Sequence, residues 1–216
     1  DREDYSAWLG VSQEQDAKDT IDALSSECHE WLVVDHYGLD RQWESSLRPY
    51  VDKLLVIDDL ANRPHDCDLL LDQNFSLIPD KKYSGLLPKM CQNLIGPRYA
   101  LIRTEYEQYR RTMNERSGEI RRVLIFVGGS DSADITDMAL EALAIPEFAH
   151  LEVDVVVGAN NPHKNKIAKR VEKQPNTHLH GPRAHLADLM AQVDLSIGGG
   201  GVTTWERMCL GLPSIV

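Results

Sequence analysis

A run of four glycines near the C-terminus is the segment of the chain best suited to hold a ligand. It follows a short apolar run and consists of Gly198, Gly199, Gly200 and Gly201, which precede Val202, Thr203, Thr204 and Glu206. No side chain in the run keeps a ligand from the backbone, and the N–H groups at a helix start attract anions. A carboxylate about one helical turn further, at Glu206, can accept two hydrogen bonds from a ribose diol. The pattern indicates a nucleoside diphosphate at a strand-to-helix turn, with a tight turn and a solvated Glu206 as the structural alternative.

A second glycine turn, formed by Gly128, Gly129, Ser130 and Asp131, follows the apolar run 123–127. From residue 123 onward, short apolar runs alternate with amphipathic segments of about ten residues, which predicts a doubly wound parallel sheet. Both glycine turns fall at carboxyl ends of strands, where open α/β sheets bind ligands. The expected strands are 123–127, 151–157, 177–180, 195–197 and 213–216, and the expected helices are 135–143, 164–173, 185–193 and one that begins at Thr203 or Thr204 and stops at Gly211.

The N-terminal half has the same character but is less regular. Apolar spacing at Ala17, Ile21, Leu24 and Cys28 predicts a helix within 16–30, and the run 31–34 is typical of a strand covered on both faces. Further segments are a helix at 41–50, strands at 53–57 and 69–71, and proline-broken loops over 75–98.

Three polar residues, Asp35, His36 and Tyr37, come directly after the strand 31–34. Polar side chains at the carboxyl end of a parallel strand face the ligand crevice of an open sheet, which makes these three candidate site residues. A helix cap and turn is the alternative interpretation of the same tetrapeptide, which ends in Gly38.

The segment 101–121 changes from apolar to charged, and Ser117-Gly118 marks a break. We therefore expect two α/β domains, 1–117 and 118–216, both with mainly parallel sheets and with a cleft between them. The chain starts without a strand or helix cap, and its last expected strand stops as soon as it begins. It is therefore expected to be an interior piece of a longer protein.

Composition excludes several classes of function. A formal net charge of −11 argues against a nucleic-acid-binding surface. No apolar run reaches the roughly 18 residues of a membrane span, and the charged start Asp1-Arg2-Glu3-Asp4 is unlike a signal peptide, so a cytoplasmic protein is expected.

The thiols and imidazoles offer few metal-binding patterns. The four cysteines, Cys28, Cys67, Cys91 and Cys209, have no Cys-x-x-Cys spacing, which favours reduced thiols. His65, Cys67 and Asp68 are spaced like metal ligands but lack a fourth ligand, so no metal site is expected. Surface or turn positions are expected for His163 and His178, whereas His180 and His185 flank the loop 181–183 and either line the ligand crevice or form part of a turn.

Several motifs, in order along nearly the whole chain, together resemble the PseG family, UDP-2,4-diacetamido-2,4,6-trideoxy-β-L-altropyranose hydrolases of pseudaminic acid biosynthesis. The motifs are Trp8-Leu9-Gly10-Val11-Ser12, the run 33–40, Ile57-Asp58-Asp59-Leu60, the segments 65–68 and 71–74, Gly96-Pro97-Arg98-Tyr99-Ala100-Leu101, Gly128-Gly129-Ser130-Asp131 and the run 199–206. The resemblance implies a GT-B-like fold, as in the peptidoglycan N-acetylglucosaminyltransferase, with two Rossmann-like domains. It also implies a link to flagellin glycosylation.

The resemblance also implies roles for residues. Glu206 matches the acid that holds the ribose, the two glycine turns match the phosphate-binding backbone of the C-terminal domain, and Tyr37, with His36 and Asp35, matches a strand end that faces the sugar. One departure is Asp134, which stands where the family often has an asparagine that contacts substrate. An anionic side chain there would repel a diphosphate.

The implied reaction is attack of water on the anomeric carbon of a UDP-sugar, with release of UDP and no need for a cofactor or metal. The family's proposed general base is a histidine in a Gly-x-Gly-His-x-x-Arg loop, which these 216 residues do not contain. Either the base lies outside this sequence or the protein lacks it. The alternatives are a UDP-sugar glycosyltransferase, in which an acceptor hydroxyl replaces water, and a non-catalytic nucleotide-sugar-binding domain.

Overall fold

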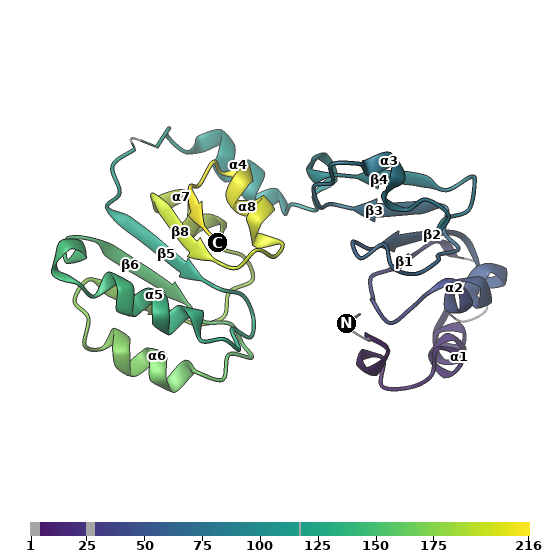
Figure 1. Ribbon diagram of the computed structural model, residues 1–216, viewed down its shortest axis with the longest axis horizontal. Coiled ribbons are helices and arrows are strands. Elements are labelled where there is room, and N and C mark those ends of the chain that lie inside the picture. Colours follow the sequence, from purple (N-terminus) through teal and green to yellow (C-terminus); the bar gives the residue numbers. More distant parts are fainter. Residues whose placement is uncertain (1–4, 25–28, 117) are drawn as a thin grey trace. The chain divides into compact units, whose positions relative to one another are not determined.

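The computed structural model describes residues 5–24, 29–116 and 118–216. The chain forms two compact α/β units, Asp1–Leu101 and Ile102–Val216 (Figure 1). The division falls earlier than the boundary near residue 118 that the sequence suggests, because Tyr106 and Tyr109 pack into the core of the second unit. The expected break at Ser117 lies at a residue outside the described part.

The first unit contains one sheet of four parallel strands in the order β1-β2-β3-β4. Its strands are β1 (His29–Val34), β2 (Val51–Ile57), β3 (Leu69–Asp72) and β4 (Gln92–Ile95). Its helices are α1 (Gln13–Leu24), α2 (Arg41–Leu47) and α3 (Pro79–Lys82), with 3₁₀ turns at Tyr5–Trp8, Arg48–Tyr50 and Pro97–Tyr99. Trp43 and Leu47 of α2 share one hydrophobic core cluster with Leu54 and Val56 of β2.

Three expectations for this unit were wrong. Helix α1 ends at Leu24 and β1 already begins at His29, while Cys28 lies outside the described residues. Strand β1 is not covered on both faces, since it forms an edge of the sheet and Val33 is 56% exposed. Strand β4 lies in the segment that was expected to form only loops. The prediction failed because this strand is stabilised by its pairing with β3 and its residues have no apolar pattern.

The second unit is a doubly wound parallel sheet, as expected. Its strand order is β7-β6-β5-β8-β9, and all neighbouring strands are parallel. Its strands are β5 (Arg122–Phe126), β6 (Glu152–Val156), β7 (Thr177–His180), β8 (Leu195–Gly198) and β9 (Ser214–Ile215). Its helices are α4 (Thr104–Thr112), α5 (Ile135–Leu143), α6 (Lys164–Val171), α7 (Ala187–Gln192) and α8 (Thr203–Cys209), with a 3₁₀ turn at Pro146–Phe148.

Alternation along β5 explains why helices cover both faces of this sheet. Val123 and Ile125 belong to a core cluster with residues of α5 and α6, whereas Leu124 belongs to a second cluster with residues of α4 and α7. All three side chains are fully buried. A strand buried on both faces is therefore apolar throughout, which is why the sequence pattern located β5 correctly. The expected fold class, two α/β units with parallel sheets, is confirmed.

Within the described residues, no helix is long and apolar enough to cross a membrane.

Candidate functional site

The strand order of the second unit creates a switch point between β5 and β8. From β5 the chain continues to β6 on one side, and it later returns to β8 on the other side. Loops that leave two such strands turn to opposite sides, so a crevice opens at their carboxyl ends. Both predicted glycine turns begin there, since Phe126 and Gly198 are register partners at the ends of β5 and β8. The tertiary structure thus brings together two motifs that lie about 70 residues apart in the sequence.

The glycines at these strand ends let three backbone segments approach each other closely. A Cβ atom at Gly158, after β6, would lie 2.4 Å from the Gly129 carbonyl oxygen. A Cβ atom at Gly198 would lie 2.3 Å from the Phe126 carbonyl oxygen. By contrast, a Cβ atom at Gly129 or Gly201 would meet nothing within 4 Å. These two glycines therefore leave the backbone open to a ligand, whereas Gly158 and Gly198 are needed for packing.

The two middle glycines of the run are less open than the sequence suggests. A Cβ atom at Gly199 would lie 3.0 Å from the Val127 carbonyl oxygen. Gly200 is exposed, but a Cβ atom there would lie 3.4 Å from the Cγ1 atom of Val216. The expectation of a run open along its whole length is therefore corrected: Gly201 has open space, Gly199 packs on backbone and Gly200 faces a side chain. That Gly199 and Gly200 contact substrate stays a prediction.

The backbone at the start of the turn 128–131 is open, as it is at Gly201. A Cβ atom at Gly128 would meet nothing within 4 Å, but its φ of 110° is a conformation that a residue with a side chain rarely adopts. Ser130 is exposed. The residues Gly128, Gly129 and Ser130 therefore leave room for a ligand beside the backbone of this turn.

The two aspartates of the first turn already have protein partners. Asp131 is buried, and its carboxylate accepts hydrogen bonds from the backbone N–H groups of Ile135 (2.9 Å) and Thr136 (3.1 Å). It therefore caps the start of α5 and occupies N–H groups that an anion would need. Asp134 has a left-handed backbone (φ 58°) and forms an ion pair with Lys166 (Oδ2–Nζ 2.5 Å). That pair offsets the repulsion that a free Asp134 would exert on a diphosphate.

Glu206 is half-buried in a polar cluster that the sequence did not reveal. It lies beside the hydroxyl of Tyr106 on α4, with Arg103 and His185 close enough to act on its charge. Burial raises the pKa of Glu206 above its ordinary value of 4.5, and the Tyr106 hydrogen bond and the charge of Arg103 oppose that rise. The Nδ1 atom of His185 is buried without a hydrogen-bond partner among the described residues. A carboxylate and an unpaired imidazole nitrogen thus share one environment.

Tyr106 holds this cluster in place. Its side chain is fully buried, and its hydroxyl accepts a hydrogen bond from the backbone N–H of Leu186 (3.1 Å). Burial raises the pKa of Tyr106, and the charge of Glu206 adds to the rise, so the phenol keeps its proton and donates a hydrogen bond to the Glu206 carboxylate. The link joins α4 to the segments around α7 and α8, which pack together in Figure 1.

Behind the glycine run lies Arg207, which the sequence analysis did not single out. Its Nη2 donates to the Gly199 carbonyl oxygen (2.7 Å) and to Thr204 Oγ1 (3.1 Å). The Thr204 hydroxyl is therefore directed toward this side chain, whereas Thr203 begins α8 and Val202 is exposed. Since α8 has only seven residues, its dipole is a small part of any attraction for an anion.

The candidate residues of the first unit form a separate network at the carboxyl edge of its sheet. Tyr37 donates from its hydroxyl to Asp59 Oδ1 (2.8 Å), and Asn74 Nδ2 donates to Asp59 Oδ2 (2.6 Å). Burial raises the pKa of Tyr37, and the hydrogen bond to Asp59 and the charges of Asp58 and Asp35 raise it further. Tyr37 is therefore a hydrogen-bond donor at neutral pH and not a base. Asp59 and Asn74 belong to motifs that the sequence analysis recognised, but no role was predicted for them.

His36 and Asp35 differ from Tyr37 in their surroundings. The Nδ1 atom of His36 accepts a hydrogen bond from the N–H of Gly38 (3.0 Å), as in the turn that was the alternative interpretation. Asp35 is exposed. Of the three adjacent residues, Asp35 has an exposed carboxylate, His36 forms part of a turn and Tyr37 has a partly buried phenol.

The residues considered as metal ligands or as further crevice residues lie beside structural partners. His65 Nδ1 lies 2.6 Å from Glu44 Oε1, Asp68 pairs with Arg48, and the Sγ atoms of Cys67 and Cys91 are 3.5 Å apart. No group of side chains suited to a metal occurs among the residues described. His180 is bound to Asp154 (Nε2–Oδ1 2.8 Å), and His163 lies in the turn that precedes α6.

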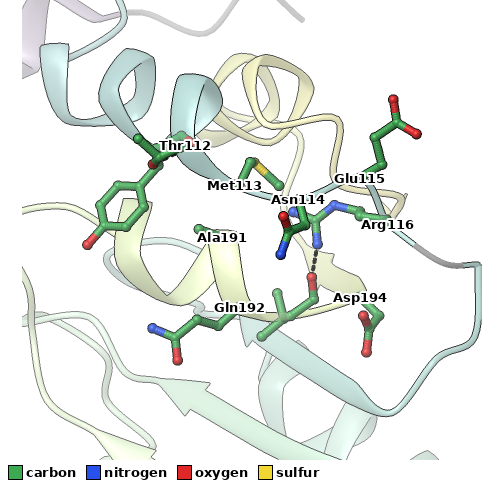
Figure 2. Close-up of a pocket in the computed structure, with 10 residues that line it drawn as sticks. Thr112, Met113, Asn114, Glu115, Arg116, Ala191, Gln192 and Asp194 are labelled. Atoms are coloured by element: carbon green, nitrogen blue, oxygen red, sulfur yellow. Dashed lines mark hydrogen bonds between the residues drawn. The ribbon is translucent and has the colours of Figure 1, made fainter.

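A cavity of about 450 Å³ lies elsewhere on the second unit, between the ends of α4 and α7 (Figure 2). Arg116 there donates to the carbonyl oxygens of Val193 and Met190 and so caps α7. Asp194, which also lines the cavity, precedes β8. The cavity is therefore at the amino edge of the sheet, the edge opposite the glycine turns.

Comparison with known proteins places the chain among sugar-processing relatives. No protein-family model matches it. It is 30% identical over 172 residues to the UDP-2,4-diacetamido-2,4,6-trideoxy-beta-L-altropyranose hydrolase of Campylobacter jejuni, covering 79% of this chain and 59% of that protein. It is 28% identical over 122 residues to the spore coat polysaccharide biosynthesis protein SpsG of Bacillus subtilis, covering 56% of this chain and 36% of that protein. The resemblance stated from the sequence is thereby confirmed.

Other similarities are more distant. An uncharacterised protein of Methanocaldococcus jannaschii is 26% identical over 192 residues, which are 86% of this chain and 39% of that protein. The chain thus spans between 36% and 59% of the length of these relatives. Among solved structures, TarM is similar with a TM-score of 0.48 and 10% identity, over 85% of this chain and 40% of that one. An O-GlcNAc transferase variant of Thermobaculum terrenum has a TM-score of 0.43 and 13% identity, over 96% of this chain and 41% of that one.

Proposed function

We propose that this chain, a relative of the Campylobacter jejuni UDP-2,4-diacetamido-2,4,6-trideoxy-beta-L-altropyranose hydrolase, is part of an enzyme that hydrolyses a UDP-linked 2,4-diacetamido-2,4,6-trideoxy sugar in pseudaminic acid biosynthesis. The observation that carries the proposal is the meeting of two glycine turns at one switch point of the second unit, with Glu206 on the helix that follows the second turn. This is the place where open α/β sheets bind nucleotides.

In this proposal the second unit holds UDP. The ribose diol donates to the Glu206 carboxylate, which has lone pairs left beside the bond from Tyr106. The diphosphate lies against the open backbone at Gly129 and Gly201, near the hydroxyl of Thr203. Backbone N–H groups so placed stabilise the charge that develops on a leaving diphosphate.

The first unit supplies groups for the sugar. Tyr37 is a protonated phenol that donates its hydrogen bond to Asp59, so its oxygen can accept a hydrogen bond from a sugar hydroxyl but cannot take a proton. In the reaction a water oxygen bonds to the anomeric carbon, the bond from that carbon to the phosphate oxygen breaks, and a base takes the proton of the water. A histidine suits that step at neutral pH. The resemblance assigns this base to a loop that is not among these residues, and His36 and His185 are the candidates if the chain acts alone.

Two other functions fit the same site. A UDP-sugar glycosyltransferase would use an acceptor hydroxyl in place of water, and a nucleotide-sugar-binding domain would bind without turnover. The natural gene product that contains this chain should be incubated with the UDP-linked diacetamido sugar, and UDP and free sugar should be quantified. Equal amounts of UDP and free sugar support hydrolysis. Release of UDP only when an acceptor is added would show a transferase, and tight UDP binding without turnover would show a binding domain.

This chain by itself allows a narrower test. Calorimetry should show that it binds UDP, and that its affinity for ADP is weaker. Absence of UDP binding by the folded chain would refute the assignment of the nucleotide to the second unit.

A further inference from the structure

Arg207 is a buried cation without a buried anion as partner. It is 2% exposed, and its guanidinium donates to a carbonyl and a hydroxyl oxygen, both of which are neutral. Its Nε atom is buried and has no hydrogen-bond partner among the residues described. Within the same part of the chain, no carboxylate forms an ion pair with it. Burial lowers the pKa of Arg207, and the charge of Glu206 opposes this only in part.

Such an arrangement is unfavourable in the free protein. An arginine keeps its proton in proteins, so burial leaves a full positive charge in a medium that screens it poorly. Buried charges are ordinarily paired, because an unpaired one loses its hydration without compensation. The arginines of the same unit that contact carboxylates, such as Arg122 with Asp154 and Arg170 with Asp137, show the usual solution.

The position of the guanidinium points to what compensates it. A Cβ atom at Gly198 would lie 2.7 Å from Arg207 Nη1, so the guanidinium packs directly against the backbone of the glycine run. Its bond to the Gly199 carbonyl oxygen fixes one peptide of that run, and its bond to Thr204 ties the run to α8. The same run has open space at Gly201, where a Cβ atom would meet nothing within 4 Å and a ligand could lie against the backbone.

We propose that Arg207 is a positioning residue that holds the Gly198–Gly201 run in its binding conformation and, through its uncompensated charge beneath the run, selects ligands by the negative charge of their phosphates. The inference rests on the proposed function, since it takes the ligand to be a nucleoside diphosphate. The free-energy cost of the buried cation is then recovered when the diphosphate binds above it.

The proposal predicts a dependence on ligand charge that a purely structural arginine would not produce. UDP, UMP and uridine share the base and ribose and differ in charge, so the ratio of their affinities isolates the electrostatic part. Arg207→Met keeps much of the volume and removes the charge. We expect it to lower the ratio of UDP to uridine affinity about tenfold or more, to leave uridine affinity within about twofold, and to leave the thermal stability of the free protein unchanged or higher.

Two further variants make the test decisive. Arg207→Lys keeps the charge but cannot form both bonds, so it should retain most of the preference for UDP over uridine, again with uridine affinity within about twofold of the unaltered chain. Arg121→Met removes a 76% exposed charge immediately before β5, at the opposite edge of the sheet, and should change the ratio of UDP to uridine affinity by less than about twofold.

The possible results separate the two proposals. If the unaltered chain binds neither UDP nor uridine, the proposed nucleotide site is wrong. If it binds UDP but Arg207→Met weakens UDP and uridine equally, or lowers stability without changing the ratio, Arg207 is only structural and the inference is overturned. Should Arg207→Met fail to fold, the lysine variant decides: loss of the UDP preference despite a retained charge would also overturn it.

Discussion

Replacing Glu206 by alanine removes the carboxylate that we place against the ribose, and its effect on binding can be worked out from the cluster around it. In the free protein the change leaves the buried Tyr106 hydroxyl without its acceptor. An unsatisfied buried donor costs about 1–3 kcal/mol of stability, and removing a half-buried carboxylate with a raised pKa recovers part of that. The variant should therefore fold, with a slightly lower melting temperature.

In the complex the same change removes the hydrogen bonds from the ribose hydroxyls. Hydrogen bonds to a charged acceptor contribute about 1.5–3 kcal/mol, so UDP affinity should fall about ten- to a hundredfold. Glu206→Gln keeps a neutral hydrogen-bond acceptor, so its affinity for UDP should lie between that of the alanine variant and that of the unaltered chain.

Calorimetry with UDP and 2′-deoxy-UDP is the assay that assigns the loss to the ribose. The unaltered chain should prefer UDP, and the Glu206→Ala variant should lose most of that preference, because the 2′-hydroxyl no longer has its partner. Met208→Ala, at a 61% exposed position of the same helix, is the matched control and should leave both affinities unchanged.

The pH dependence provides a second measurement. Binding requires the ionised carboxylate, and burial raises the pKa of Glu206 above 4.5, so acidification should weaken UDP binding at a higher pH than an exposed glutamate would allow. Glu206→Gln should remove that pH dependence. A folded Glu206→Ala protein that binds UDP as tightly as the unaltered chain, with the deoxy preference intact, would refute the ribose assignment.

Other changes test the remaining parts of the structure. Tyr37→Phe should lower the kcat of the natural enzyme about tenfold, because one oriented hydrogen bond is lost. UDP affinity, measured by calorimetry, should stay nearly constant. A variant with the same kcat as the unaltered enzyme would contradict the role of Tyr37 at the sugar. Asp154→Asn should destabilise the chain by about 3 kcal/mol in urea denaturation, near the low end for a buried pair because Arg122 is 29% exposed. Burial opposes ionisation of Asp154, but hydrogen bonds from Arg122 and His180 lower its pKa overall. The carboxylate therefore stabilises the fold fully above the ordinary aspartate pKa, and this stabilisation disappears as pH falls through the lowered pKa of Asp154. The Asn variant should lack that acid-dependent loss of stability. Gly198→Ala should lower stability by about 1–3 kcal/mol because of the contacts its Cβ would make, whereas Gly201→Ala should keep stability and weaken UDP binding, and equal melting temperatures for the two would contradict the packing described.

Local sequence patterns located most elements of the second unit. The run 123–127 is apolar throughout because β5 is buried on both faces, and α5 was expected at its observed bounds, Ile135–Leu143. Helix α8 ends before Gly211, whose φ of 58° suits a residue without a side chain. The same reasoning missed β4, since Gln92 and Asn93 carry no apolar signal and the strand exists through its pairing with β3.

By itself, the sequence determined the strand–turn–helix units, the two glycine turns and a carboxylate one turn into α8, because each depends on residues close together in the chain. Only the tertiary structure decided that β5 and β8 are neighbours and so bring both turns to one switch point. It also placed Tyr106 beside Glu206, turned Gly200 toward Val216 and buried Arg207 against the Gly199 carbonyl oxygen. The physical reason is that strand pairing and side-chain burial join residues distant in sequence, and such pairings are set by the packing of the whole unit rather than by local residue patterns.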